Sequence, residues 1–131
     1  ATDSARVLSG HSITVNTNSS IVALGIDLGG TLTLGATTTL EISGDWNING
    51  SLARNSGTIS AVSASTLQSF YNTSGSTISL ANLSVNNANG LDIASGDWAL
   101  SGDLQVTAGG LDVSTANSFT LSSDAGATRF L

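Results

Sequence analysis

Residues 24–42 read LGIDLGGTLTLGATTTLEI, and within this stretch an apolar residue returns two positions after each of three leucines. The resulting pairs are Leu24/Ile26, Leu32/Leu34 and Leu40/Ile42. Successive side chains of a β-strand point to opposite faces, so each pair predicts a short strand with two inward side chains. The pairs recur at an even spacing, with glycine in each connection. The stretch therefore predicts three short strands joined by tight turns.

The same pattern extends through most of the chain. Further pairs are Ile13/Val15, Trp46/Ile48, Ile78/Leu80, Leu83/Val85, Leu91/Ile93, Trp98/Leu100, Leu104/Val106, Leu111/Val113 and Phe119/Leu121. Helix signals are weak, because strong helix formers such as Glu, Lys, Arg, Gln and Met are rare or absent and glycine interrupts most windows. The composition and the alternation together predict an all-β protein.

Short strands at even spacing are compatible with a small β-sandwich or with a coiled solenoid. Sandwich strands usually run to about five or six residues with hairpin turns, and the strands expected here are shorter and more regular. We therefore predict a right-handed parallel β-solenoid (β-helix) of about five or six coils, each of about 20–26 residues. It spans residues 1–131 as one segment. Residues 59–77 show the weakest alternation and are expected to be a loop or a broadened coil.

The only two tryptophans lie in a repeated phrase, SGDW, at residues 43–46 and 95–98. The spacing between Trp46 and Trp98 predicts that they occupy the same position in the solenoid, two coils apart. On that interpretation Asp45 and Asp97 lie about 10 Å apart, at roughly 4.8 Å per coil. Such a separation is too large for two carboxylates to share a proton or a calcium ion.

Charge and composition exclude several classes of function. Only 9% of the 131 residues are charged, the formal net charge is −6, and the chain has no lysine. Binding to nucleic acid requires a basic surface, and an anionic membrane repels an acidic one. The absence of cysteine excludes disulfides, thiol catalysis and zinc–thiolate sites. No apolar run approaches the roughly 20 residues that span a bilayer.

Two stretches resemble β-solenoid repeat modules of large secreted and cell-surface proteins of gliding bacteria. Residues 9–16, SGHSITVN, are similar to an opening xGHxVTV coil in these modules. Residues 66–113 resemble their FxNLTINNxxGVTLSGDLTVNGTLTLTSG repeats, most closely from Leu83 to Val113, with a turn at 86–90 and a following strand at 102–106. The resemblance implies a solenoid exported to the cell surface or medium. It implies no reaction, and the C-terminal sorting domain common in those proteins is not recognisable here.

The residues that could support catalysis have simpler structural explanations. Turn positions allow Asp45, Asp97, Asp103 and Asp124 to cap backbone N–H groups, and Asp27, Glu41, Asp92 and Asp112 should point to solvent. His11, without a second histidine or a cysteine, is expected at a turn of the first coil. The Thr-x-Thr pairs at 31/33 and 37/39 do not recur in other coils, as an ice-binding face requires. We expect no enzyme activity, cofactor or metal site.

Two classes of function remain. Trp46, Tyr71 and Trp98 are candidates for stacking on sugar rings in a carbohydrate-binding module, although each tryptophan begins an apolar pair and is expected to be buried. The preferred interpretation is a structural scaffold, an adhesin stalk or filament-forming subunit, because open solenoid ends are strand edges that attract further strands. Its expected partners are flanking coils or identical subunits, with a polysaccharide or other cell-surface component in the binding alternative. The expected location is extracellular, and the chain reads as an excerpt of a longer surface protein.

Overall fold

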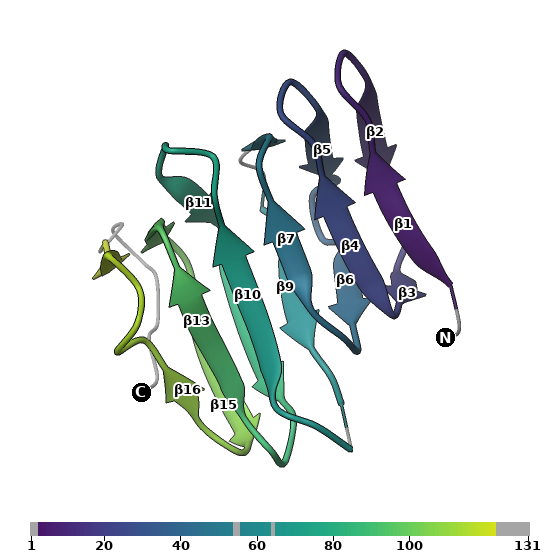
Figure 1. Ribbon diagram of the computed structural model, residues 1–131. Helices are drawn as coiled ribbons and strands as arrows, with labels where there is room; N and C mark the ends of the chain where they lie inside the picture. The colour runs from purple at the N-terminus through teal and green to yellow at the C-terminus, as the bar shows by residue number, and fades with distance from the viewer. Residues whose placement is uncertain (1–2, 54–55, 64, 123–131) are drawn as a thin grey trace.

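The computed structural model describes residues 3–53, 56–63 and 65–122, and this part of the chain forms seventeen short strands without an α-helix (Figure 1). Each complete coil contributes one strand to each of three faces, and all neighbouring strands are parallel. Figure 1 shows the coils succeeding one another from β1 at one end to β16 at the other. The predicted all-β parallel solenoid is confirmed, with about five turns.

The first face is one continuous six-stranded sheet. Its strands are β1 (Ser4–Val7), β4 (Ala23–Ile26), β7 (Trp46–Ile48), β10 (Gln68–Asn72), β13 (Leu91–Ser95) and β16 (Leu111–Asp112). The third face is a five-stranded sheet of β3 (Ser19–Ile21), β6 (Thr39–Ile42), β9 (Thr58–Ala61), β12 (Asn82–Asn86) and β15 (Leu104–Ala108).

The second face is divided into two three-stranded sheets. One contains β2 (Ser12–Val15), β5 (Thr31–Leu34) and β8 (Ser51–Ala53), and the other contains β11 (Ile78–Leu80), β14 (Asp97–Leu100) and β17 (Ser118–Leu121). The strands β8 and β11 lie in contact but are not joined as neighbours in one sheet. The interruption falls where the coils are longest.

The coils differ in length. On the first face Ser4 pairs with Ala23 and Leu91 pairs with Leu111, whereas in the middle of the sheet Trp46 pairs with Phe70 and Phe70 with Ile93. The step from one coil to the next is therefore short at both ends and longest between Trp46 and Phe70.

The weakly alternating region at residues 59–77 overlaps this longest step as far as Phe70. It includes β10, which lies in the middle of the six-stranded sheet between β7 and β13. The region therefore combines both alternatives: β10 and the end of β9 (Thr58–Ala61) belong to the solenoid sheets, and the described residues 62–63, 65–67 and 73–77 form no strand.

The interior is an unbroken apolar column. Both members of eight predicted pairs are buried: Leu24/Ile26, Leu32/Leu34, Leu40/Ile42, Trp46/Ile48, Ile78/Leu80, Leu83/Val85, Leu91/Ile93 and Trp98/Leu100. The pairs near the two ends are less covered, with Ile13 42% and Val113 38% exposed. Sequence analysis missed other members of the core, namely Val7, Ile59, Ala61 and Phe70, because none of them belongs to one of the predicted pairs.

Glycine is required where one coil crosses closely over the next. Gly50 lies in the corner between β7 and β8, and a Cβ atom there would overlap the carbonyl oxygens of Asp27 and Gly30 in the preceding coil. The same Gly30 carbonyl accepts a hydrogen bond from the Ser51 N–H at 2.9 Å. A side chain at residue 50 is therefore incompatible with the stacking distance that this bond sets.

We expect Gly50→Ala to lower the free energy of unfolding by about 1–3 kcal/mol, because the neighbouring backbone must shift to admit the methyl group. Gly110→Ala is the matched control, since a Cβ atom there meets no atom within 4 Å, and its effect should stay within about 0.5 kcal/mol. Urea unfolding followed by circular dichroism compares the two variants. Equal losses of stability would contradict the close approach at Gly50.

Candidate functional site

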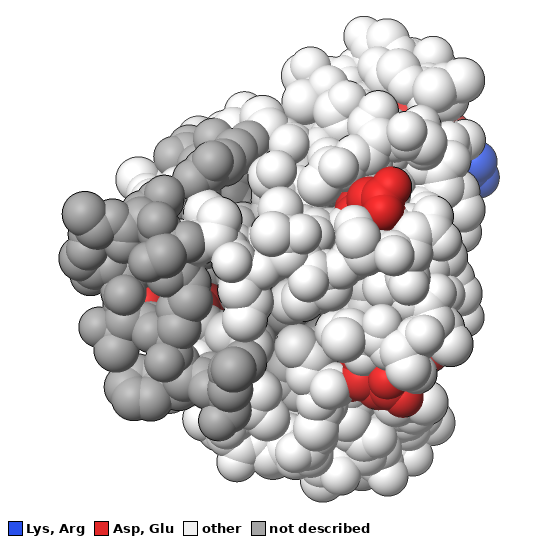
Figure 2. Space-filling view, turned by 90° about the vertical axis from the view of Figure 1, so that its left-hand side faces the viewer, with Lys and Arg blue, Asp and Glu red and all other residues white. Residues whose placement is uncertain are grey.

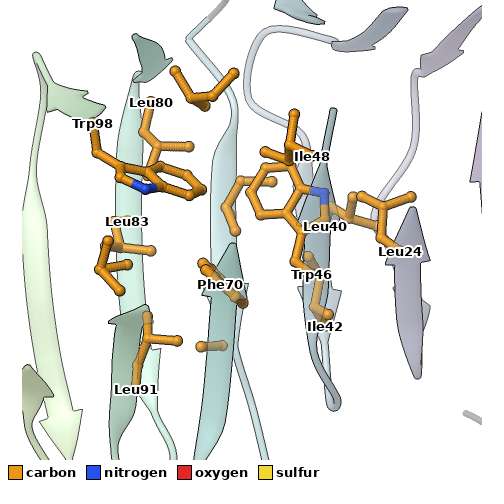
Figure 3. Close-up of a cluster of buried hydrophobic side chains, with 14 of the residues drawn as sticks. Leu24, Leu40, Ile42, Trp46, Ile48, Phe70, Leu80, Leu83, Leu91 and Trp98 are labelled. Atoms are coloured by element: carbon orange, nitrogen blue, oxygen red, sulfur yellow. The ribbon is translucent and has the colours of Figure 1, made fainter. Parts of the chain in front are cut away.

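Both tryptophans lie in the core, where Figure 3 shows them together with Phe70. Trp46 and Trp98 are 0% exposed. The ring centroids of Trp46 and Phe70 are 5.3 Å apart in an edge-to-face arrangement, and those of the two indoles are 6.1 Å apart. Their predicted burial is confirmed. Of the three proposed sugar-stacking residues, only Tyr71 reaches the surface, at 36% exposure.

The two buried indoles differ in their hydrogen bonding. The Trp98 Nε1–H donates to the Ser95 carbonyl oxygen at 2.7 Å. The Trp46 Nε1–H, by contrast, has no hydrogen-bond partner among the described residues. A buried donor without an acceptor costs about 1–3 kcal/mol relative to a satisfied one. Trp46 thus contributes apolar and aromatic contacts at the expense of an unsatisfied polar atom.

The two SGDW phrases do not occupy equivalent positions, which corrects the repeat predicted from their spacing. Trp46 begins its pair on β7 of the first face, whereas Trp98 lies on β14 of the second face. The partners of Trp46 in register are Leu24 and Phe70, while Trp98 lies between Ile78 and Phe119.

The predicted stacking of Asp45 over Asp97 is wrong for the same reason. On the first face Trp46 pairs with Phe70 and Phe70 with Ile93, so two coils take 47 residues, whereas the two tryptophans are 52 residues apart. The second tryptophan therefore lies five residues beyond two whole coils, and its phrase falls at a different corner.

The acidic residues at turns have local structural roles. Asp45 accepts a hydrogen bond from the Ser69 N–H at 2.9 Å, as predicted for a capping residue. Asp97 differs from the prediction, because it begins β14 and its carboxylate accepts a hydrogen bond from the Ser118 hydroxyl, at 2.7 Å, instead of from a backbone N–H. Asp103 is exposed, and Asp124 lies outside the described residues. Figure 2, which looks onto the β16 end, shows acidic atoms in separate small patches on a largely uncharged surface.

The remaining acidic residues agree with the predicted outward orientation. Glu41 is exposed between buried Leu40 and Ile42, and Asp92 lies between buried Leu91 and Ile93. The exposed Asp112 carboxyl accepts a hydrogen bond from the Ser114 backbone N–H at 2.8 Å. This bond, followed by one from the Ser114 hydroxyl, holds the pKa of Asp112 below its ordinary value.

His11 lies where the sequence predicted it, in the turn between β1 and β2. It is exposed, with Nδ1 3.0 Å from the Ser9 carbonyl oxygen. Within the described ranges, no three His, Cys, Asp or Glu side chains gather in a way that could hold a metal ion.

Three buried carboxamides, which sequence analysis did not single out, join the wider coils. Gln68 is 0% exposed, and its Nε2 donates to the carbonyl oxygens of Ile42 and Gly44 at 2.7 and 2.8 Å. Asn87, also 0% exposed, brings its Nδ2 to 3.2 Å from the Gln68 Oε1. The sequence does mark Gln68 and Asn87, because each places an amide where the corresponding position of another coil has an apolar or a turn residue.

The third carboxamide, Asn72, performs a similar role at the other end of β10. Its Nδ2 donates to the carbonyl oxygens of Ser76 and Asp97, both at 2.8 Å, and its Oδ1 accepts from the Ser74 N–H at 3.0 Å. Asn72 is 5% exposed. Because buried polar groups are stable only when hydrogen-bonded, these side chains fix the corners of the broad coils.

A surface hollow with a volume of about 640 Å³ lies on the outside of the first face, over β1, β4 and β7. It follows the outward row Arg6, Gly25 and Asn47, whose members are paired in register. Gly25 leaves the middle of this row without a side chain. The polar residues Asp27, Asp45, Asn49 and Thr73 also line the hollow.

The rim of the hollow combines an ion pair with an exposed aromatic ring nearby. Arg6 Nε donates to Asp27 Oδ1 at 2.8 Å. On β10, Tyr71 is paired with Asn47 and so continues the row that contains Gly25. Tyr71 does not itself line the hollow, but it is the register neighbour of Asn47, which does.

Comparisons with known proteins found no matching family model, no matching curated protein and no matching solved structure. The described residues include no helix with the length and apolarity needed to cross a membrane.

The two tryptophans allow a paired test of the core. We expect Trp98→Phe to lower the free energy of unfolding by about 1–3 kcal/mol more than Trp46→Phe, because only the first substitution removes a hydrogen bond and only the second removes an unsatisfied donor. Both variants lose a similar volume, so the cavity contribution is matched. Urea unfolding gives the difference. A smaller loss for Trp98→Phe would contradict the assigned hydrogen bonding.

Proposed function

We propose that this β-solenoid is a structural scaffold, a shaft segment of a secreted or surface-attached bacterial protein on which further coils stack end to end. The proposed role is mechanical and involves no catalysis. The observation that carries it is the incomplete cover of the core at the β1–β3 end. Ile13 is 42% exposed, whereas its partner in register one coil further in, Leu32, is 2% exposed.

The backbone at this end supports the same proposal. β1, β2 and β3 are each the terminal strand of their sheet. A terminal strand carries backbone N–H and C=O groups that can pair with another strand. A further coil that stacks here would continue three ladders at once and would cover Ile13.

The proposed extracellular setting rests on the resemblance of residues 9–16 and 66–113 to repeats of exported surface proteins of gliding bacteria. A low charge content and a densely hydrogen-bonded β-stack suit a structural part that must resist proteases. Antibody labelling of intact cells, compared with lysed cells, tests the location. We expect labelling of intact cells or recovery from the medium, and labelling only after lysis would contradict the proposed setting.

End-to-end stacking predicts that the isolated chain associates into elongated species as its concentration rises. Sedimentation velocity and electron microscopy measure this association. Ile13→Lys should abolish it, because a charge at the exposed end of the core opposes the addition of a coil. Leu28→Lys is the control, since Leu28 is 67% exposed but lies at a corner of the second coil.

A wild-type chain that stays monomeric, or equal association of the Ile13→Lys and Leu28→Lys variants, would contradict stacking of identical chains at this end. Circular dichroism of each variant establishes whether the solenoid is retained.

A further inference from the structure

The hollow over β1, β4 and β7 has features of a polysaccharide-binding surface, and we propose that the protein binds an uncharged polysaccharide there, with the polymer lying along the solenoid axis. The inference goes beyond the scaffold role and is independent of end-to-end stacking. It rests on the shape of the hollow, its polar lining, the position of Tyr71 and the local charge.

The shape of the hollow favours a polymer over a small molecule. A small-molecule pocket usually buries most of its ligand, but this hollow of about 640 Å³ is open to solvent along the outer face of the sheet. Gly25 provides the floor, flanked in register by Arg6 and Asn47. An extended chain can lie in such a trough and accumulate weak contacts over several coils.

The lining supplies groups suited to sugar hydroxyls. Carboxylates accept hydrogen bonds from hydroxyls, carboxamides both donate and accept, and a guanidinium presents several donors in one plane. Asp45, Asn47 and Asn49 provide the first two kinds of group on one side of the trough. On the other side Arg6 is held by its 2.8 Å bond to Asp27, which orients the guanidinium at the rim.

Tyr71 places an aromatic ring further along the same row. The register runs Arg6, Gly25, Asn47, Tyr71 across four successive strands of the first face. At about 4.8 Å per strand, the row extends over roughly 14 Å. A polymer parallel to the axis therefore meets both the trough and the exposed phenol ring, whose apolar face can pack against a sugar ring.

The charge of the hollow favours an uncharged polysaccharide over an anionic one. The pairing of Arg6 with Asp27 leaves Asp45 as the remaining charge among the lining residues, and the whole chain has a formal net charge of −6. An anionic polysaccharide is therefore repelled.

A protein partner is less favoured than a polysaccharide. The centre of a protein–protein interface is usually apolar. The most exposed leucines, Leu8, Leu28 and Leu67, are not among the residues that line this hollow. Leu24 and Ile26 do line the hollow but are buried, at 4% and 1% exposure, so they offer a protein partner little apolar surface.

Affinity gel electrophoresis tests the proposal with the full chain and soluble neutral polymers, namely galactomannan, xyloglucan, laminarin and dextran, with alginate as the anionic comparison. The chain carries Ile13→Lys throughout, so that association cannot add avidity. We expect at least one neutral polymer to retard the protein and alginate to leave its mobility unchanged.

Two variants locate the site. Gly25→Gln fills the trough, and its backbone tolerates a side chain because a Cβ atom meets only the Arg6 Cγ at 3.6 Å. Tyr71→Ala removes the aromatic ring. We expect each to weaken binding about tenfold. The control for Gly25→Gln is Ser84→Gln, at an outward position of β12 on the third face. The control for Tyr71→Ala is Val113→Ala, at a residue that is 38% exposed. Both controls should bind normally.

Several results would overturn the proposal. These are the absence of retardation by all four neutral polymers, retardation that neither Gly25→Gln nor Tyr71→Ala weakens, and binding of alginate equal to that of the neutral polymers. Circular dichroism of the variants separates a loss of binding from a loss of fold.

Discussion

Parallel backbone hydrogen bonding holds each coil of this protein about one strand spacing from the next, and the rest of the structure adapts to that constraint. At Gly50 the neighbouring carbonyl oxygens come so close that a Cβ atom has no space. Where the chain is longer, at the step from Trp46 to Phe70, the additional residues cannot increase the spacing between coils and are accommodated within the coil. The sheet of the second face is interrupted along the same part of the chain, between β8 and β11.

The interior of these longer coils is filled in two ways. Trp46, Phe70 and Trp98 gather from two faces into one aromatic cluster (Figure 3), and the buried carboxamides of Gln68 and Asn87 occupy a corner. The aromatic rings supply volume and apolar contact. The carboxamides satisfy carbonyl groups of adjacent coils, as a solenoid corner requires when its backbone is removed from water. At Trp46 the indole fills the core although its N–H group has no hydrogen-bond acceptor among the described residues.

The same architecture leaves two surfaces with different properties. The end formed by β1, β2 and β3 exposes terminal strands and partly covered apolar side chains, which suit continuation of the stack. The outer side of the first face is polar and hollowed at Gly25, with Tyr71 further along. A scaffold that extends at its end and binds along its side would use the two surfaces without conflict, because one lies across the solenoid axis and the other runs parallel to it.

The sequence by itself determined the strands and the inward side of each, because alternation with a period of two is a local property that any short window displays. It therefore predicted the solenoid, the core pairs and the burial of both tryptophans. The position of each phrase around the solenoid was decided only by the tertiary structure, because it depends on the summed lengths of the preceding coils, which are unequal. For that reason the two SGDW phrases, alike in sequence, lie on different faces. The hollow beside Tyr71 was decided in the same way, because it joins residues of successive coils that only the register brings together.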